Sequence, residues 1–90
     1  MSFDKKQAIF TYVLTGASFT INEEDGITAV AMKLLSGTGT YLGSKTVNGI
    51  LSTASPLVVD KGVTVTSEQT KYIDNLVIDA SAGVIEIIAR

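Results

Sequence analysis

The chain has 90 residues, enough for one domain with a modest core, and it contains neither cysteine nor histidine. These absences exclude disulfides, thiolate and imidazole metal ligands, and the most common general base of enzymes. The net charge is −2 without a basic stripe, and no apolar run is long enough to cross a membrane, so we expect neither nucleic-acid nor membrane binding.

Charged residues make up only 18% of the chain, whereas about 25% is usual. A small domain with so few charges often has part of its surface covered by a partner. Serine and threonine are abundant and could supply the polar surface instead, so both interpretations stay open. The start of the chain lacks a signal-peptide pattern, and we expect synthesis in a cytoplasm.

Strands are expected to dominate, because threonine, valine and isoleucine are common and turn residues interrupt the chain at short intervals. The pattern predicts a first strand at about Ala8–Leu14, a turn at Thr15–Ala17 and a short strand at Ser18–Ile21. The polar segment Asn22–Gly26 follows as a turn that closes on glycine.

Ile27–Leu35 is predicted to be the longest strand. Both faces of its alternating pattern are largely apolar, so we expect it in the middle of a sheet and buried on both sides. Its residues Ala29–Leu35 also have good helix propensity, and a helix is the alternative. The lack of helical periodicity beyond these residues favours the strand.

Asn48-Gly49 is the clearest turn signal in the chain, because this pair is preferred in two-residue hairpin turns. It predicts a hairpin between strands at Ser44–Val47 and Ile50–Thr53. Ser36–Gly39 is expected to be a loop or a wide hairpin turn, and Ser55-Pro56 should interrupt strand pairing because proline lacks a backbone N–H.

The rest of the chain completes an all-β pattern of about eight short strands. The fold predicted is a small antiparallel two-sheet sandwich of jelly-roll type, one domain over residues 1–90 with 1–7 as an N-terminal arm. The last two strands are expected to form a hairpin across Ala80–Gly83, and Ser67–Tyr72 is expected to be a loop. The remaining strands are predicted at Leu57–Val59, Val63–Thr66, Asn75–Asp79 and Val84–Ile88.

Segments that could carry chemistry are few, and none has a diagnostic spacing. Glu23–Asp25 could surround a calcium ion but does not follow a known calcium-loop pattern, so a solvated turn is favoured. Ser36–Thr40 contains Gly-x-Gly without the helix that a phosphate loop needs. Carboxylates that could pair for hydrolysis are scattered, at Asp60, Glu68, Asp74, Asp79 and Glu86. We therefore predict a non-enzymatic protein with no catalytic residue, metal or cofactor.

The C-terminal strand is apolar on both faces, with Ile85 and Ile87 on one and Val84 and Ile88 on the other. Such a strand at a sheet edge would invite aggregation, so it should lie in the middle of a sheet or be covered by another chain. Central placement is favoured, and Lys33 is then a candidate partner for Glu86.

Aromatic residues offer a second set of contact candidates. Phe10 and Tyr12 alternate along the first strand, a pattern that suits a core or an interface equally. The predicted interface residues are Phe10, Tyr12, Val84, Ile85, Ile87 and Ile88. An aromatic platform for sugars or for a partner could be formed by Phe10, Tyr12, Phe19, Tyr41 and Tyr72.

From Phe19 onward the chain resembles the small β-sandwich virion accessory proteins of tailed bacteriophages, of the head-decoration or head-fibre type. The similar elements are Glu24–Thr28, Val47–Gly49, Ser55–Leu57, Lys61–Val65 and Leu76–Ala89. The resemblance implies a structural protein located in the virion, which self-associates as a homo-oligomer, with a trimer as one form, and contacts other virion proteins. The alternative is a carbohydrate- or receptor-binding β-sandwich module.

Overall fold

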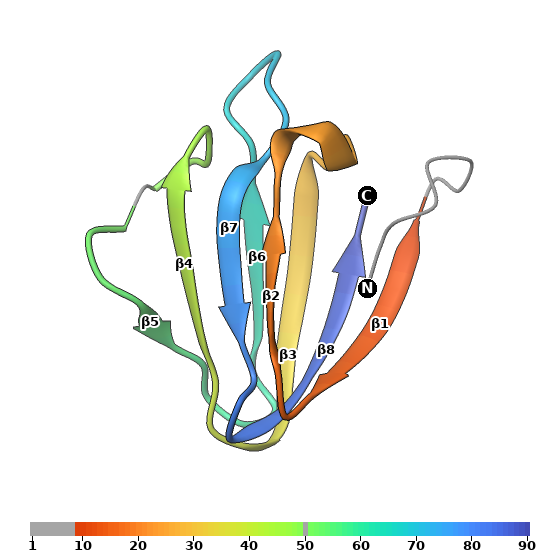
Figure 1. Cartoon of the computed structure of the whole chain (residues 1–90), viewed down its shortest axis with the longest axis vertical. Coiled ribbons are helices and arrows are strands. Elements are labelled where there is room, and N and C mark those ends of the chain that lie inside the picture. Colours follow the sequence, from red (N-terminus) through yellow and green to blue (C-terminus); the bar gives the residue numbers. More distant parts are fainter. Residues whose placement is uncertain (1–8, 50) are drawn as a thin grey trace.

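The structure is a computed structural model that describes residues 9–49 and 51–90, so the predicted arm at 1–7 lies outside the described residues. In the described part of the chain, eight strands and one short 3-10 helix form a sandwich of two sheets (Figure 1). The elements are β1 (Phe10–Thr15), β2 (Ser18–Ile21), η1 (Glu23–Asp25), β3 (Ala29–Gly37), β4 (Thr40–Lys45), β5 (Ser55–Pro56), β6 (Gly62–Thr66), β7 (Asp74–Asp79) and β8 (Gly83–Ala89).

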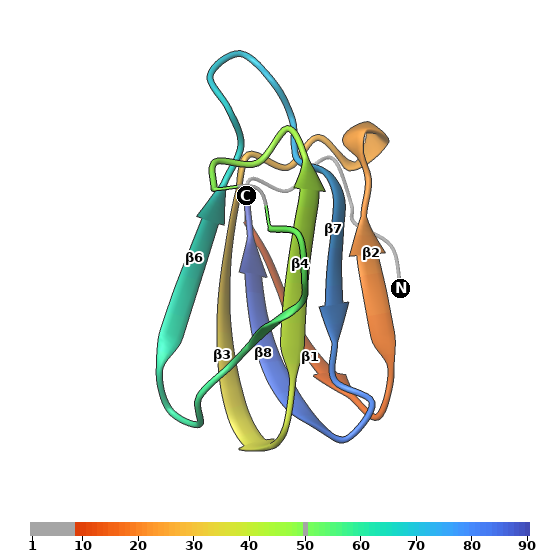
Figure 2. The same cartoon turned by 90° about the vertical axis from the view of Figure 1, so that its left-hand side faces the viewer.

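The strand order is that of a jelly roll. Sheet A has the order β1–β8–β3–β6, and sheet B has the order β2–β7–β4–β5. The pairs β1/β8, β2/β7, β3/β6 and β4/β5 are all antiparallel, as in one long hairpin rolled up on itself. Figure 2 shows β6, β3 and β8 in one layer and β4, β7 and β2 in the other. The predicted all-β sandwich of jelly-roll type is confirmed.

The core lies between the two sheets and is built from alternate residues of the strands. Inward side chains of sheet A, such as Met32 and Ile87, pack against inward side chains of sheet B, such as Leu76 and Ile78. Within the described residues, no polar or charged residue is buried. The hydrophobic effect acting on this apolar layer is therefore the main source of stability.

The central strands of sheet A agree with the sequence pattern in type but not in burial. Ala29–Gly37 is a strand rather than a helix, and β8 lies between β1 and β3 as expected for an apolar terminal strand. The expectation that both faces of β3 are buried is wrong, because Lys33 and Leu35 are exposed. In a two-layer sandwich only the face toward the other sheet is covered.

The hairpin predicted at Asn48-Gly49 is not formed. Gly49 does have the positive φ of a turn residue, 72°, but β4 ends at Lys45 and no strand runs through the described residues 51–53. Instead the Asn48 side chain donates hydrogen bonds to the Thr66 hydroxyl (3.2 Å) and the Ser67 carbonyl (3.0 Å). These bonds tie the segment to the end of β6, across the sandwich from β4.

Between the strands that the structure describes, every connection except that from β4 to β5 crosses from one sheet to the other. The predicted hairpin across Ala80–Gly83 is wrong, because β7 belongs to sheet B and β8 to sheet A. The prediction that Ser55-Pro56 interrupts strand pairing is wrong, because these residues form the short edge strand β5 beside β4. Proline is tolerated there because one side of the strand has no ladder. The strand predicted at Leu57–Val59 is reduced to an isolated bridge between Leu34 and Val59.

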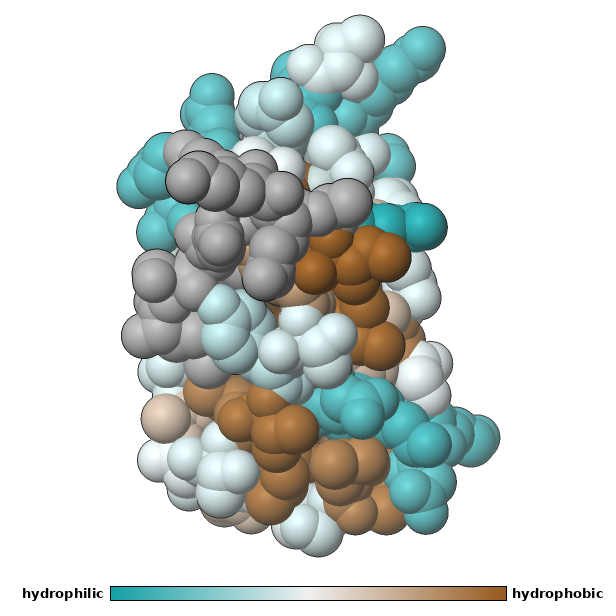
Figure 3. All heavy atoms as spheres, turned by 90° about the vertical axis from the view of Figure 1, so that its right-hand side faces the viewer, coloured by the Kyte–Doolittle hydropathy of each residue, from teal (hydrophilic) through white to brown (hydrophobic). Residues whose placement is uncertain are grey.

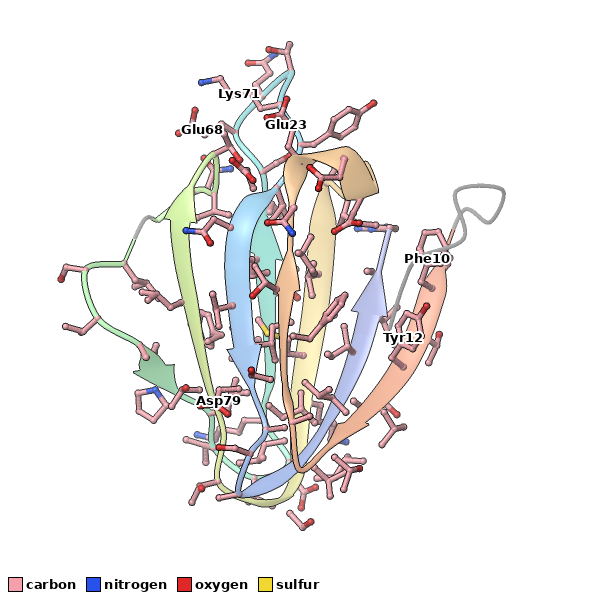
Figure 4. All side chains as sticks on the ribbon, viewed as in Figure 1. Phe10, Tyr12, Glu23, Glu68, Lys71 and Asp79 are labelled. Carbon is pink, nitrogen blue, oxygen red and sulfur yellow. The ribbon has the colours of Figure 1, made fainter. Side chains whose placement is uncertain are left out.

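Asp79 stabilises the connection from β7 to β8. The backbone N–H of Ser81 donates a 2.9 Å hydrogen bond to Oδ1 of Asp79, at the base of the sandwich in Figure 4. This bond and a further one from the Ser81 side chain lower the pKa of Asp79 below its ordinary value. The ionised carboxylate therefore contributes more to the turn than the neutral acid does.

The low pKa predicts how folding stability changes in acid. The contribution of Asp79 is fully present above the ordinary aspartate pKa of about 3.9 and is lost as the pH falls through the lower folded value. Asp79→Asn should keep an acceptor for Ser81 but remove the charge. Urea unfolding between pH 2 and 6 should show a gap between wild type and variant that closes toward low pH. An equal gap at every pH would contradict this assignment.

Candidate interaction surface on sheet A

Sheet A has a second face, which points away from sheet B. It is formed by the residues that alternate with the core residues along each strand. The registers place Val13 of β1, Glu86 of β8 and Lys33 of β3 side by side in one row across the sheet. We call the following set the outer face: Thr11, Val13, Thr15, Ala31, Lys33, Leu35, Ser36, Gly62, Thr64, Val84, Glu86 and Ile88.

The outer face exposes apolar side chains. Val13 is 58% exposed, and Leu35 and Ile88 are each 39% exposed. Figure 3 views the sandwich from the edge at which β1 lies, and it shows brown apolar groups between white and teal ones. The solvent-facing side of an antiparallel sheet is normally polar, so an apolar outer face is a candidate contact surface.

A β-bulge adds one of these apolar side chains. The register between β3 and β8 runs from Leu34↔Ile85 to Ser36↔Val84 and so leaves Leu35 as an extra residue. Leu34 is buried, whereas Leu35 and Ser36 are both exposed. The bulge therefore turns two successive side chains outward, which a regular strand would not do.

One positive and one negative charge lie within this apolar surface. Lys33 and Glu86 are direct cross-strand partners, as the sequence suggested. They nevertheless form no ion pair within 4.0 Å, although both residues are among those that the structure describes. An ion pair does join Lys71 and Glu68, at 3.1 Å, in the loop after β6.

The six predicted interface residues divide between the core and the outer face. Phe10, Ile85 and Ile87 are buried, and Tyr12 is partly buried and packs against the core; Figure 4 shows Phe10 and Tyr12 on β1. Only Val84 and Ile88 belong to the outer face. Sequence reasoning missed Val13 and Leu35. The alternation in β1 could have identified Val13, because it points opposite to Tyr12.

The loops at one end of the sandwich present a second accessible feature, the side chain of Tyr72. It is 51% exposed and borders two shallow hollows, one shared with Glu23, Glu24 and Gly26 and the other with residues that include Arg90. Figure 4 shows Glu23, Glu68 and Lys71 at this end.

The backbone around Tyr72 is firmly held. The hydroxyl of Thr46 donates to the Tyr72 carbonyl at 2.6 Å and accepts from the Asp74 N–H at 2.9 Å. The N–H of the buried Ile73 donates to the Ile27 carbonyl at 2.7 Å. The Tyr72 ring is thus exposed on a backbone that is held in place, so it could serve as a small binding site for a ligand or partner.

The acidic residues considered as ligands or catalysts have structural partners or lie apart. Asp25 accepts a 2.8 Å hydrogen bond from the Asn22 N–H and so closes the turn of η1. Asp74 accepts one from the Glu23 N–H at 3.2 Å. Within residues 9–49 and 51–90, no three histidine, cysteine, aspartate or glutamate residues are grouped as a metal site would require.

Comparison of the chain with family models, curated proteins and solved structures gave no significant match. In the described part of the chain, no helix has the length and apolar character needed to cross a membrane. The surfaces of the molecule are therefore the basis for a functional proposal.

Proposed function

We propose that this chain is a non-enzymatic structural protein of a tailed-phage virion, a capsid decoration or accessory protein that acts by packing of identical copies on the particle. The observation that carries the proposal is the group of exposed apolar side chains on the outer face of sheet A, Val13, Leu35 and Ile88, which are accessible to a partner. Surfaces of this character are typical of permanent subunit contacts.

Two further points support this function. The jelly roll is an architecture used by viral capsid and lectin domains, although a fold alone does not establish a function. The likeness of Glu24–Thr28, Lys61–Val65 and Leu76–Ala89 to phage accessory proteins points the same way. These segments contain most of η1, most of β6, most of β7 and all of β8.

The proposed virion function can be tested on purified phage particles. The gene should lie among head or tail genes of a phage or prophage, and mass spectrometry of purified particles should find the chain in many copies. Particles assembled without it should keep their shell proteins and lose heat or salt resistance or an outer feature seen by electron microscopy. A chain absent from gradient-purified particles would rule this function out.

The second candidate is a carbohydrate- or receptor-binding module, and the exposed Tyr72 favours it. An aromatic face beside carboxylates can stack on a pyranose while the carboxylates accept hydrogen bonds from its hydroxyls. A glycan array that gives a signal with wild type but not with Tyr72→Ala would support this module. The control variant Tyr12→Phe should keep the signal, because Tyr12 packs against the core.

A further inference from the structure

The outer face has two unlike halves that meet at the seam between β8 and β3. On the β8 side of this seam lie β1 and β8, and on the other side lie β3 and β6. Because the register fixes which residues are opposite each other, the two halves can be compared row by row.

The charges are opposite in the central row. Glu86 lies on the β8 side of the seam and Lys33 lies directly across it on β3. Neither is buried, and the two do not pair with each other within 4.0 Å. Each charge therefore remains available to a group that approaches from outside the sheet.

The side chains on the two sides of the seam also differ in size. In the central row, Val13 on the β8 side corresponds to Gly62 on the β3 side. In the next row, Ile88 corresponds to Ala31, which is its direct cross-strand partner. In each of the two rows, therefore, one larger apolar side chain on the β8 side corresponds to a smaller residue on the β3 side.

We propose that two copies of the chain pack outer face to outer face about a two-fold axis that runs along the β8–β3 seam. Rotation by 180° about that axis places the β3 half of one copy over the β8 half of the other. Lys33 of each copy then lies over Glu86 of the second copy, and Ile88 of each lies over the small Ala31. Self-complementarity of this kind is what an isologous contact requires.

The contact is compatible with ordinary sheet packing. Two sheets packed face to face lie about 10 Å apart with their strands aligned within about 30°, and an axis along the strands gives this aligned arrangement. The apolar members Val13, Leu35 and Ile88 lose contact with water on association, while the two Lys33–Glu86 pairs fix the register. This inference names the partner for the self-association in the proposed function and rests on it to that extent.

Charge reversal tests the contact by sedimentation equilibrium of the full chain. Lys33→Glu brings two carboxylates together across the contact, because the new side chain lies over Glu86 of the second copy. Glu86→Lys brings two ammonium groups together in the same way, over Lys33. Each single variant should raise the dimer dissociation constant at least about 100-fold, since like charges brought together at an interface cost several kcal/mol. The double variant Lys33→Glu/Glu86→Lys should dimerise like wild type.

Mixing the two single variants is the most specific arm of the experiment. The Lys33→Glu variant carries two acidic side chains at the seam, and the Glu86→Lys variant carries two basic ones. An equimolar mixture should therefore form a heterodimer, which native mass spectrometry can detect. Lys71→Glu makes the same charge change outside the outer face and should leave dimerisation unchanged. Ile88→Ala, an uncharged change at an exposed site, should weaken the dimer while circular dichroism stays that of wild type.

Several results would overturn the contact. They are a monomeric wild type, a trimer as the sole species, or single reversals that associate as tightly as wild type. A chain that fails here but is found in purified particles refutes the seam contact and leaves the virion function standing. A chain that dimerises through the seam but is absent from particles refutes the virion function and leaves the seam contact standing.

Discussion

Gly37→Ala is expected to destabilise the fold by about 2–5 kcal/mol, a large part of the about 5–13 kcal/mol available to a domain of this size. Gly37 has a φ of 74°, which an alanine adopts only with strain. A Cβ there would also collide with the Ala82 carbonyl oxygen and lie 2.7 Å from Cα of Gly83, its partner on β8. Thermal unfolding should show a midpoint lower by about 4–8 °C for each kcal/mol.

Gly16→Ala is the matched control for this variant. Gly16 has a similar φ of 64°, but a Cβ at this position meets nothing within 4 Å. Its cost should be limited to the conformational strain of about 1–2 kcal/mol. If both alanine variants melt at the same temperature, the close approach of β3 to the start of β8 is not what requires glycine at position 37.

Ile87→Ala is expected to cost about 3–4 kcal/mol, because it empties a fully buried site in β8, one of the two central strands of sheet A. The side chain is 0% exposed and belongs to the core cluster, so its removal leaves a cavity that the fixed strands on either side cannot close. Urea unfolding should show a lower midpoint with little change in slope.

The neighbouring residue provides the comparison. Ile88→Ala deletes the same atoms one position along β8, from a side chain that is 39% exposed on the outer face. Measured on monomeric protein, its cost should stay below about 1 kcal/mol. Equal destabilisation by the two variants would mean that the outer face is covered within the monomer and is not free for a partner.

The positions of most strands could be predicted from the sequence because alternation and turn residues are local signals. The exception is the middle of the chain, where the strands predicted at Ser44–Val47, Ile50–Thr53 and Leu57–Val59 do not match β4 and β5. Ser18–Ile21 has the predicted bounds, and Met32 and Lys33 point to opposite faces as their pattern requires. Which strands pair is not a local property. The two hairpin predictions failed because Asn48 bonds to the end of β6 and because the turn after Asp79 leads into the other sheet.

The same limit applies to the candidate surface. The apolar character of both faces of Val84–Ile88 was visible in the sequence, and it correctly indicated a central strand. The sequence could not show which of its faces points outward, nor that a bulge turns Leu35 to that side. The meeting of Val13, Glu86 and Lys33 in one row depends on pairings between strands that are far apart in the chain.

The pairing of β1 with β8 also determines when the domain can fold during synthesis. β8 is the sole ladder partner of β1 within the described residues and also separates it from β3, so sheet A cannot close until the last strand has left the ribosome. Until then the backbone N–H and C=O groups of β1 and β3 that pair with β8 lack this partner and can pair with other chains. Contacts between such distant segments also make folding slow, in the millisecond-to-second range typical of β-sandwiches. Chains whose sheet A is still incomplete are therefore exposed to chaperones and to one another for longer than chains of a fold built from local contacts.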